Sequence, residues 1–118
     1  MHTVMVVDDN QFMRKRITKT LDGNGYRVIE AEDGVKAVEL YSSARPDAVL
    51  MDVVMPNKDG LEALAEIRQL DPRAIVIMLT ALDQQAVAVK AVQAGAKDFL
   101  AKPVVPDKLV AALQKVLR

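Results

Sequence analysis

The stretch AVLMD, from Ala48 to Asp52, consists of four apolar residues followed by one carboxylate, and Pro56 comes soon after it. A short apolar run that ends in a charge and a proline-containing loop is typical of a buried parallel strand. The carboxyl end of such a strand lies at the rim of a sheet, so we expect Asp52 at that rim. A carboxylate there can act as a nucleophile, a metal ligand or a helix cap.

Apolar runs and helical patterns alternate along the rest of the chain. We expect strands over residues 4–7, 26–31, 48–52, 74–79 (ending at Thr80) and 98–101. We expect helices over 11–21, around Val35, Val38 and Tyr41, around Leu61, Leu64 and Ile67, over 83–94, and from Pro106 onward. Alternation with short links predicts an α/β fold, in which a doubly wound five-stranded parallel sheet is covered by five helices.

Composition limits the classes of function. The 118 residues suggest one domain over 1–118, and the absence of cysteine excludes disulfides, zinc thiolate sites and thiol catalysis. Sixteen basic residues balance 16 acidic ones, and aromatic residues are scarce, which argues against a nucleic-acid surface. No apolar stretch approaches the roughly 20 residues that span a bilayer, and no signal peptide precedes the first strand pattern. We expect a cytoplasmic protein that binds neither nucleic acid nor membranes.

The four apolar strands end in side chains with compatible chemistry. The first ends in Asp8-Asp9, the third in Asp52, the fourth in Thr80 and the fifth in Lys102. Ligands of open α/β sheets bind outside the carboxyl ends of the strands, so these side chains should converge. Three carboxylates that lie close together repel one another and need compensating cations. Lys102 supplies one charge, an all-oxygen site suits Mg²⁺, and a remaining carboxylate could accept a phosphoryl group.

Each of these residues also has a simpler interpretation. Asp9 or Asn10 could cap the first helix, Thr80 could be an ordinary strand-end residue, and Lys102 could be solvated. Two other enzyme or cofactor classes share the predicted fold. A flavodoxin-like FMN site needs a loop that cradles phosphate, which Asp8 and Asp9 would repel. A haloacid-dehalogenase-like phosphohydrolase needs a general acid two residues after its nucleophile, where this chain has Val54.

Four segments together carry a family resemblance: VVDD at 6–9, MDVVMPNKDG at 51–60, LTA at 79–81 and GAKDFLAKP at 95–103. Over its whole length the chain resembles a response-regulator receiver domain of two-component signalling. The resemblance implies the sheet order 2-1-3-4-5. It also implies a signalling phosphoacceptor, with self-phosphorylation and autodephosphorylation as its only activities, rather than an enzyme.

The resemblance implies roles for particular residues. Asp52 would accept the phosphoryl group of a phosphohistidine, carried by a sensor histidine kinase or a phosphotransfer protein. Asp8, Asp9, Asp52 and the backbone carbonyl of Val54 would hold Mg²⁺ or Mn²⁺. Thr80 and Lys102 would bind the phosphoryl group.

The resemblance also implies a conformational switch. The bond between Lys102 and Pro103 would be cis. Phe99 would be the switch aromatic, which turns inward as Thr80 moves toward the phosphate. The fourth helix, the fifth strand and the last helix would then present a changed face to an output partner.

Within the family, FMR at 12–14 and QQAVAVKAVQAGAKDF at 84–99 resemble stand-alone chemotaxis-type regulators. The sequence stops just after its last helix, which suggests that no DNA-binding effector follows. Lys108 and Ala112 stand where winged-helix regulators carry a dimerising acid and arginine, so we expect a monomer. The alternatives are a phosphorelay intermediate or a receiver fragment of a larger DNA-binding regulator.

Three further hypotheses concern lifetime and partners. Val54 and Leu82 lie two residues after Asp52 and Thr80, and neither side chain can hydrogen-bond an attacking water, so we expect a long-lived acyl phosphate. The first helix is basic and could dock an acidic kinase domain or simply be solvated; its basic residues are Arg14, Lys15, Arg16 and Lys19. The outer face of the fourth helix would bind the output partner, with Ala91 as a test position.

Overall fold

The computed structural model describes residues 1–117, and the side chain of Leu82 also lies outside the described part. Its strands are β1 (Thr3–Val7), β2 (Arg27–Ala31), β3 (Ala48–Asp52), β4 (Val76–Thr80) and β5 (Asp98–Ala101). Its helices are α1 (Gln11–Gly23), α2 (Gly34–Ala44), α3 (Gly60–Leu70), the 3-10 turn η1 (Leu82–Gln84), α4 (Gln85–Gln93) and α5 (Pro106–Val116). The five strands are parallel in the order β2-β1-β3-β4-β5, which confirms the predicted fold class and strand order.

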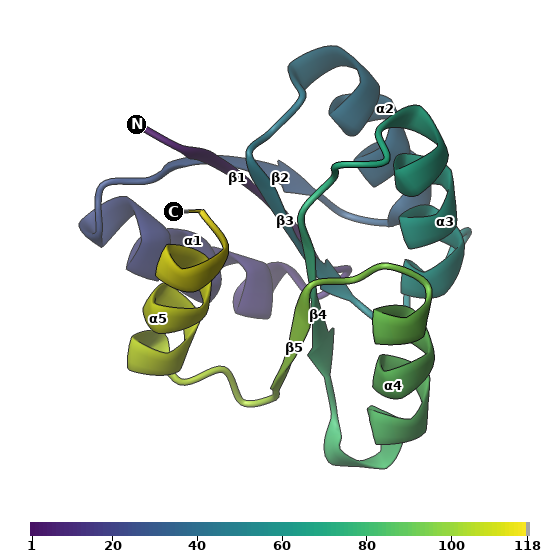
Figure 1. Ribbon diagram of the computed structural model, residues 1–118. Helices are drawn as coiled ribbons and strands as arrows, with labels where there is room; N and C mark the ends of the chain where they lie inside the picture. The colour runs from purple at the N-terminus through teal and green to yellow at the C-terminus, as the bar shows by residue number, and fades with distance from the viewer. Residues whose placement is uncertain (118) are drawn as a thin grey trace.

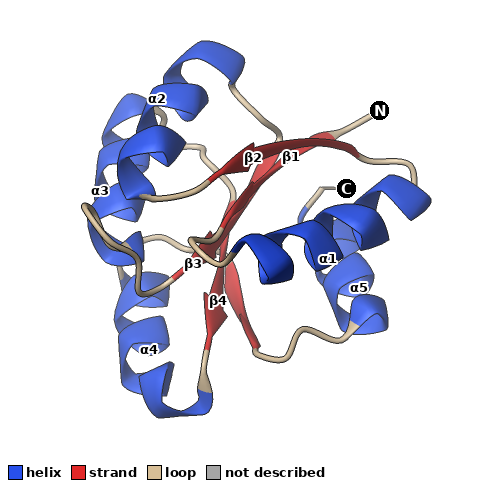
Figure 2. Cartoon of the chain, turned by 180° about the vertical axis from the view of Figure 1, so that it is seen from behind, coloured by secondary structure: helices blue, strands red, loops and turns tan. Residues whose placement is uncertain are grey.

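The sheet is covered on both faces, with α2, α3 and α4 on one side and α1 and α5 on the other (Figures 1 and 2). Side chains of successive strand residues point to opposite faces, so each strand contributes to two cores. Within β3, Val49 and Met51 pack toward α2 and α3, whereas Leu50 packs with α1 and α5. β3 is therefore buried throughout, as its continuous apolar run predicts.

The loops at the carboxyl ends of the strands are held by helix caps. Asn10 accepts a hydrogen bond from the Met13 amide at 3.1 Å, and Asp33 accepts one from the Lys36 amide at 2.8 Å. A Cβ atom on Gly60 would overlap the backbone oxygen of Asp52, so only glycine lets α3 begin this close to the end of β3. The caps hold the loops that follow β1 and β2, and the close approach of Gly60 holds the backbone at the end of β3.

The structure corrects several predicted boundaries and faces. β2 begins at Arg27 rather than Tyr26, and β4 at Val76 rather than Ala74. The helix expected over 83–94 is a 3-10 turn followed by α4, and the Gln84 side chain accepts a hydrogen bond from the Ala81 amide at that turn. Val35 is 41% exposed because Ala37 takes the buried position on α2. None of the helices over residues 1–117 is long and apolar enough to cross a bilayer.

Candidate functional site

The ends of four strands bring the predicted site residues to one edge of the sheet. Asp52 ends β3 and Thr80 ends β4, while Asp8 and Lys102 directly follow β1 and β5. The parallel register places Val7 beside Met51, Asp52 beside Leu79, and Thr80 beside Ala101, so the strand ends are level with one another. This alignment turns four separate sequence positions into one site.

Three carboxylates form the centre of the site. Oxygen atoms of Asp8, Asp9 and Asp52 lie within 4.8 Å of one another. Asp8 is fully buried and Asp52 is 5% exposed, whereas Asp9 is exposed. The Lys102 Nζ lies 2.8 Å from Asp52 Oδ1 and 3.4 Å from Asp8 Oδ2. Lys102 is thus an internal counter-ion and not a solvated lysine.

The two opposite charges at the centre shift each other's protonation. Burial raises the pKa of the Asp52 carboxyl, and the charges of Asp8 and Asp9 raise it further, against the opposing effect of Lys102. Burial lowers the pKa of the Lys102 ammonium, but the hydrogen bond and charge of Asp52, together with Asp8, outweigh it, so the net shift is upward. One ammonium therefore compensates the carboxylates only in part.

Two polar atoms at the site have no hydrogen-bond partner among the described residues. Asp52 Oδ1 accepts hydrogen bonds from Lys102 and from the Val53 amide at 2.9 Å, whereas no donor among the described residues contacts Oδ2. The Thr80 hydroxyl is completely buried and has no hydrogen-bond partner within the described part of the chain. A buried hydroxyl without a partner costs free energy, and such exceptions occur where a water, an ion or a ligand completes the bonding.

The residues present fit a divalent cation. The donor set is all oxygen, three carboxylates face one ammonium, and one of the three remains open to solvent at Asp9. Mg²⁺ binds through one or two carboxylates and keeps several waters, which requires such an open edge. Asn10, and not Asp9, caps α1, so the Asp9 carboxylate is available to the cluster.

The remaining predicted residues lie around this centre. The Lys102–Pro103 bond is cis, as the resemblance implied. Val54, after the end of β3, is 58% exposed, and Phe99 on β5 is 37% exposed. The Leu82 side chain, predicted to influence the acyl phosphate lifetime, lies outside the described residues, so that prediction stays untested.

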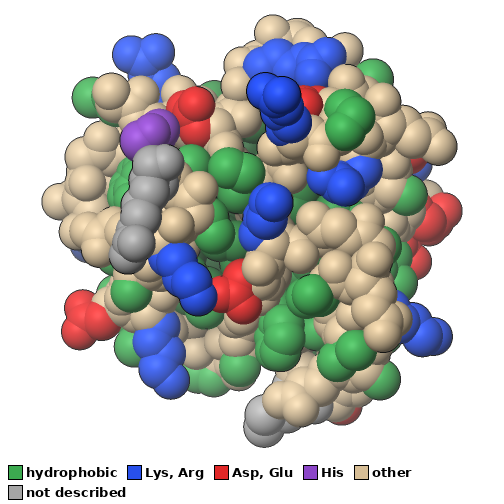
Figure 3. Space-filling view, viewed as in Figure 1, with side chains coloured by type: hydrophobic (Ala, Val, Ile, Leu, Met, Phe, Trp, Pro, Cys, Tyr) green, Lys and Arg blue, Asp and Glu red, His purple; other side chains and the backbone are tan. Residues whose placement is uncertain are grey.

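Two surface predictions can be compared with the structure. On α1, Arg14 and Lys15 pair with Glu30, at 2.9 and 3.0 Å, whereas Arg16 and Lys19 are exposed, so docking through this basic helix stays a prediction. On α4, Ala91 is fully buried against the core, because that face of the helix packs on β4 and β5. Basic and acidic side chains are scattered over the face of the molecule seen in Figure 3.

Sequence reasoning missed one contact of the site. Arg14 Nη1 donates to the backbone carbonyl of Asp8 at 2.6 Å. The available signal was spacing, because Arg14 lies one helical turn after the Asn10 cap and can reach back toward the end of β1.

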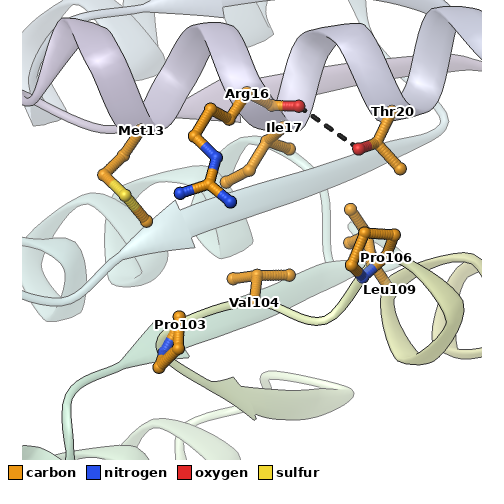
Figure 4. A pocket seen from close by; sticks show the side chains of 8 residues that line it. All are labelled: Met13, Arg16, Ile17, Thr20, Pro103, Val104, Pro106 and Leu109. Atoms are coloured by element: carbon orange, nitrogen blue, oxygen red, sulfur yellow. Dashed lines mark hydrogen bonds between the residues drawn. The ribbon is translucent and has the colours of Figure 1, made fainter.

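A small hollow lies apart from the acidic site, between α1 and the segment that leads into α5 (Figure 4). Met13 and Ile17 line it from α1, and Pro103 and Leu109 line it from the other side. Its volume of about 50 Å³ is far below the several hundred Å³ of typical cofactor pockets. It cannot hold a flavin.

Comparison with known proteins agrees with this geometry. Residues 4–114 match the family described as response regulator receiver domain. The chain is 47% identical to the chemotaxis protein CheY of Bacillus subtilis (strain 168) over 98% of each chain. It is 45% identical to CheY of Thermotoga maritima over 96% of this chain and 95% of that protein.

Solved structures agree as well. The receiver domain of NtrX from Brucella abortus is 29% identical, with a TM-score of 0.93 over 97% of both chains. The response regulator domain of Thermotoga maritima CheB is 33% identical, with a TM-score of 0.92 over 99% of this chain and 96% of that one. The chain therefore belongs to the response regulator receiver domain family of two-component signalling.

Proposed function

We propose that this receiver accepts a phosphoryl group on Asp52 from a phosphohistidine, in a Mg²⁺-dependent reaction, and thereby switches the binding of a partner. The observation that carries the proposal is the state of Asp52: a buried carboxylate with one oxygen held by Lys102 at 2.8 Å and the other without a described donor. The phosphohistidine would come from a sensor histidine kinase or a phosphotransfer protein.

The two carboxylate oxygens of Asp52 have different roles in the phosphoryl transfer. Asp52 Oδ2 attacks phosphorus, the phosphorus–nitrogen bond breaks, and its electron pair returns to the imidazole of the donor. Lys102 neutralises charge on the phosphoryl oxygens, and the unpartnered Thr80 hydroxyl donates a hydrogen bond to one of them. Asp8, Asp9, Asp52 and the Val54 carbonyl would hold Mg²⁺, or Mn²⁺ in its place, which supplies further charge neutralisation.

The same hydroxyl connects phosphorylation to the surface. Thr80 gains a bonding partner when Asp52 is phosphorylated, and its shift makes room for Phe99, which moves inward from its half-exposed position on β5. The face formed by α4, β5 and α5 then changes for its output partner. Its exposed apolar side chains are Val89, Val92, Phe99 and Val105.

The pathway is a further proposal. Relatives named chemotaxis protein CheY align over nearly their whole length, which supports a chemotaxis-type regulator. We expect this regulator to be cytoplasmic and monomeric and to have no enzymatic output. The second candidate is a receiver from a phosphorelay or a larger DNA-binding regulator. It is supported by the response regulator MprA of Mycobacterium sp. (strain KMS), which is 40% identical and of which the chain covers 50%.

Intact-mass measurement after incubation with acetyl phosphate tests the proposal. The parent should gain one phosphoryl group only with Mg²⁺, and Asp52→Asn should gain none. Asp107→Asn, at an exposed acid in the first turn of α5, is the matched control and should behave as the parent. No gain by the parent, either from acetyl phosphate or from a histidine-kinase donor, would contradict the proposal.

A further inference from the structure

The Arg14 side chain joins three elements at the edge of the acidic site. It projects from α1, and its Nη1 donates to the Asp8 carbonyl at 2.6 Å while its Nε donates to Glu30 on β2 at 2.9 Å. Only 13% of the side chain is exposed, so it is packed within the fold. A guanidinium can hold both acceptors at once because its nitrogens are fixed in one plane.

The backbone carbonyl of Asp8 needs a hydrogen-bond donor from outside the sheet, because β1 ends at Val7. Its amide still donates to the Ala31 carbonyl, at 3.2 Å, and its Oδ1 accepts from the Asn10 amide at 2.9 Å. The Asp8 carbonyl lies beyond the last residue of β1, and its hydrogen bond comes from Arg14. The backbone of Asp8 is thereby held from both sides, which fixes the direction of its carboxylate.

Glu30 anchors the guanidinium to the sheet. It lies on β2 in register with Val6 of β1, so it is close to the strand that carries Asp8. Its Oε1 accepts from Arg14, and its Oε2 accepts from Lys15 at 3.0 Å. Lys15 is 59% exposed and makes no described contact with Asp8, which makes it a matched neighbour without the bridging role.

The positive charge of Arg14, taken alone, would weaken the binding of a divalent cation, whereas its hold on the Asp8 backbone would strengthen that binding. A cation beside a carboxylate cluster repels a second cation, so an unpaired Arg14 would weaken Mg²⁺ binding. The single charge of Glu30, shared with Lys15, offsets the Arg14 charge in part, so the geometric contribution must outweigh the repulsion that remains. The sign of the effect therefore distinguishes a positioning role from an electrostatic one.

We infer that Arg14, anchored by Glu30, is a positioning residue that holds the Asp8 backbone so that the carboxylates of Asp8 and Asp9 face Asp52 for binding a divalent cation. This inference rests on the proposed function. Removing a group that orients a metal ligand typically weakens metal binding by about 10- to 100-fold.

Calorimetric titration with Mg²⁺ alone, on the unphosphorylated protein, tests the inference. Arg14→Met and Arg14→Lys should each weaken binding by about tenfold, because lysine keeps the charge but has one nitrogen in place of the two that bridge Glu30 and Asp8. Glu30→Gln should weaken binding in the parent but add little in the Arg14→Met background. Lys15→Met should leave the affinity close to that of the parent.

A second readout needs no metal. The Asn10 amide, which donates to Asp8 Oδ1, should shift in the NMR spectrum of the Mg²⁺-free protein on Arg14→Lys, and stay in place on Lys15→Met. The unfolding free energy in urea shows whether each variant is folded at the titration temperature.

Two patterns of Mg²⁺ affinity would overturn the inference by itself. Mg²⁺ affinity unchanged in both Arg14 variants would mean that the contact serves stability alone. Parent-like affinity in Arg14→Lys with tighter binding in Arg14→Met would mean that the charge matters and the bridge does not. In both cases the proposed function stands if the parent binds Mg²⁺ and is phosphorylated on Asp52; if the parent does neither, both fail together.

Discussion

Replacing Asp52 with asparagine should stabilise the folded protein in the absence of divalent cations, although it removes an ion pair. At an effective dielectric constant of about 20, the attraction across 2.8 Å between Asp52 and Lys102 is about 6 kcal/mol. The repulsion from Asp8, which lies within 4.8 Å, is at least about 3.5 kcal/mol, and that from the exposed Asp9 is about 1 kcal/mol after solvent screening.

These Coulomb terms nearly cancel, so the cost of burying the Asp52 charge decides the sign. That cost is on the order of several kcal/mol for one ion, even after the protein relaxes. Asparagine has no such charge, retains an oxygen for the Val53 amide, and leaves Lys102 with Asp8 as its partner. We expect the unfolding free energy of Asp52→Asn to rise by about 2 kcal/mol, which is about 1 M in the urea midpoint.

The pH dependence provides a second check on the same balance. The pKa of Asp52 is raised in the folded state, so the folded protein binds more protons than the unfolded chain between the two pKa values. The contribution of Asp52 to the unfolding free energy of the parent should therefore rise as the pH falls through the folded pKa of Asp52, and it should level off below the lower pKa of the unfolded chain. Asp52→Asn should lack that part of the slope.

Urea unfolding followed by circular dichroism, in EDTA and across this pH range, measures both effects. Added Mg²⁺ should stabilise the parent more than Asp52→Asn, because the variant has lost one of the three carboxylates. If Asp52→Asn is less stable than the parent in EDTA at neutral pH, the Lys102 ion pair outweighs the burial cost and the reasoning is wrong.

Three further predictions concern individual positions. Thr80→Val should raise the unfolding free energy, measured in urea, by about 1 kcal/mol, because it removes a buried hydroxyl that has no described partner. The same variant should lower the yield of phosphorylation. A loss of stability would show that the hydroxyl is bonded in the resting state. Ala91→Glu should lose more than about 3 kcal/mol of stability since it buries a carboxylate, whereas Val89→Glu, at a 50% exposed position, should change it by less than about 0.5 kcal/mol; similar values for the two would contradict the observed phase of α4. Val54→Asn should accelerate loss of the phosphoryl group severalfold, followed by intact mass, because an amide beside Asp52 can orient water; an unchanged or slower rate would refute the predicted role of Val54.

The candidate site could be predicted because its geometry follows from a local rule. Each apolar run ends in a polar residue, and parallel strands bring their carboxyl ends to one edge. The convergence of Asp8, Asp52, Thr80 and Lys102 therefore needs only the strand assignments and the direction of the strands. The spacing of the apolar residues supplies both.

The phase of α4 could not be predicted in the same way. The helix is rich in alanine and valine, so its sequence has no sharp division between an apolar and a polar side. Packing against β4 and β5 decided that Ala88 and Ala91 are buried while Val89 and Val92 are exposed. The choice between Asp9 and Asn10 as the cap of α1 was likewise open until the backbone angles placed Asn10 at the helix start.

The order of the elements, the parallel sheet and the acids at its edge follow from the residue pattern alone, because they depend on periodicity and on where each apolar run stops. The pairing of side chains between elements does not follow from that pattern and depends on how the elements pack. Arg14 contacts Glu30 and the Asp8 carbonyl because α1 packs beside β1 and β2, which brings both acceptors within hydrogen-bond distance of the guanidinium. A long side chain has many rotamers, and no periodic pattern in the sequence indicates which one it adopts. Its partners are therefore set by the packing of the whole fold.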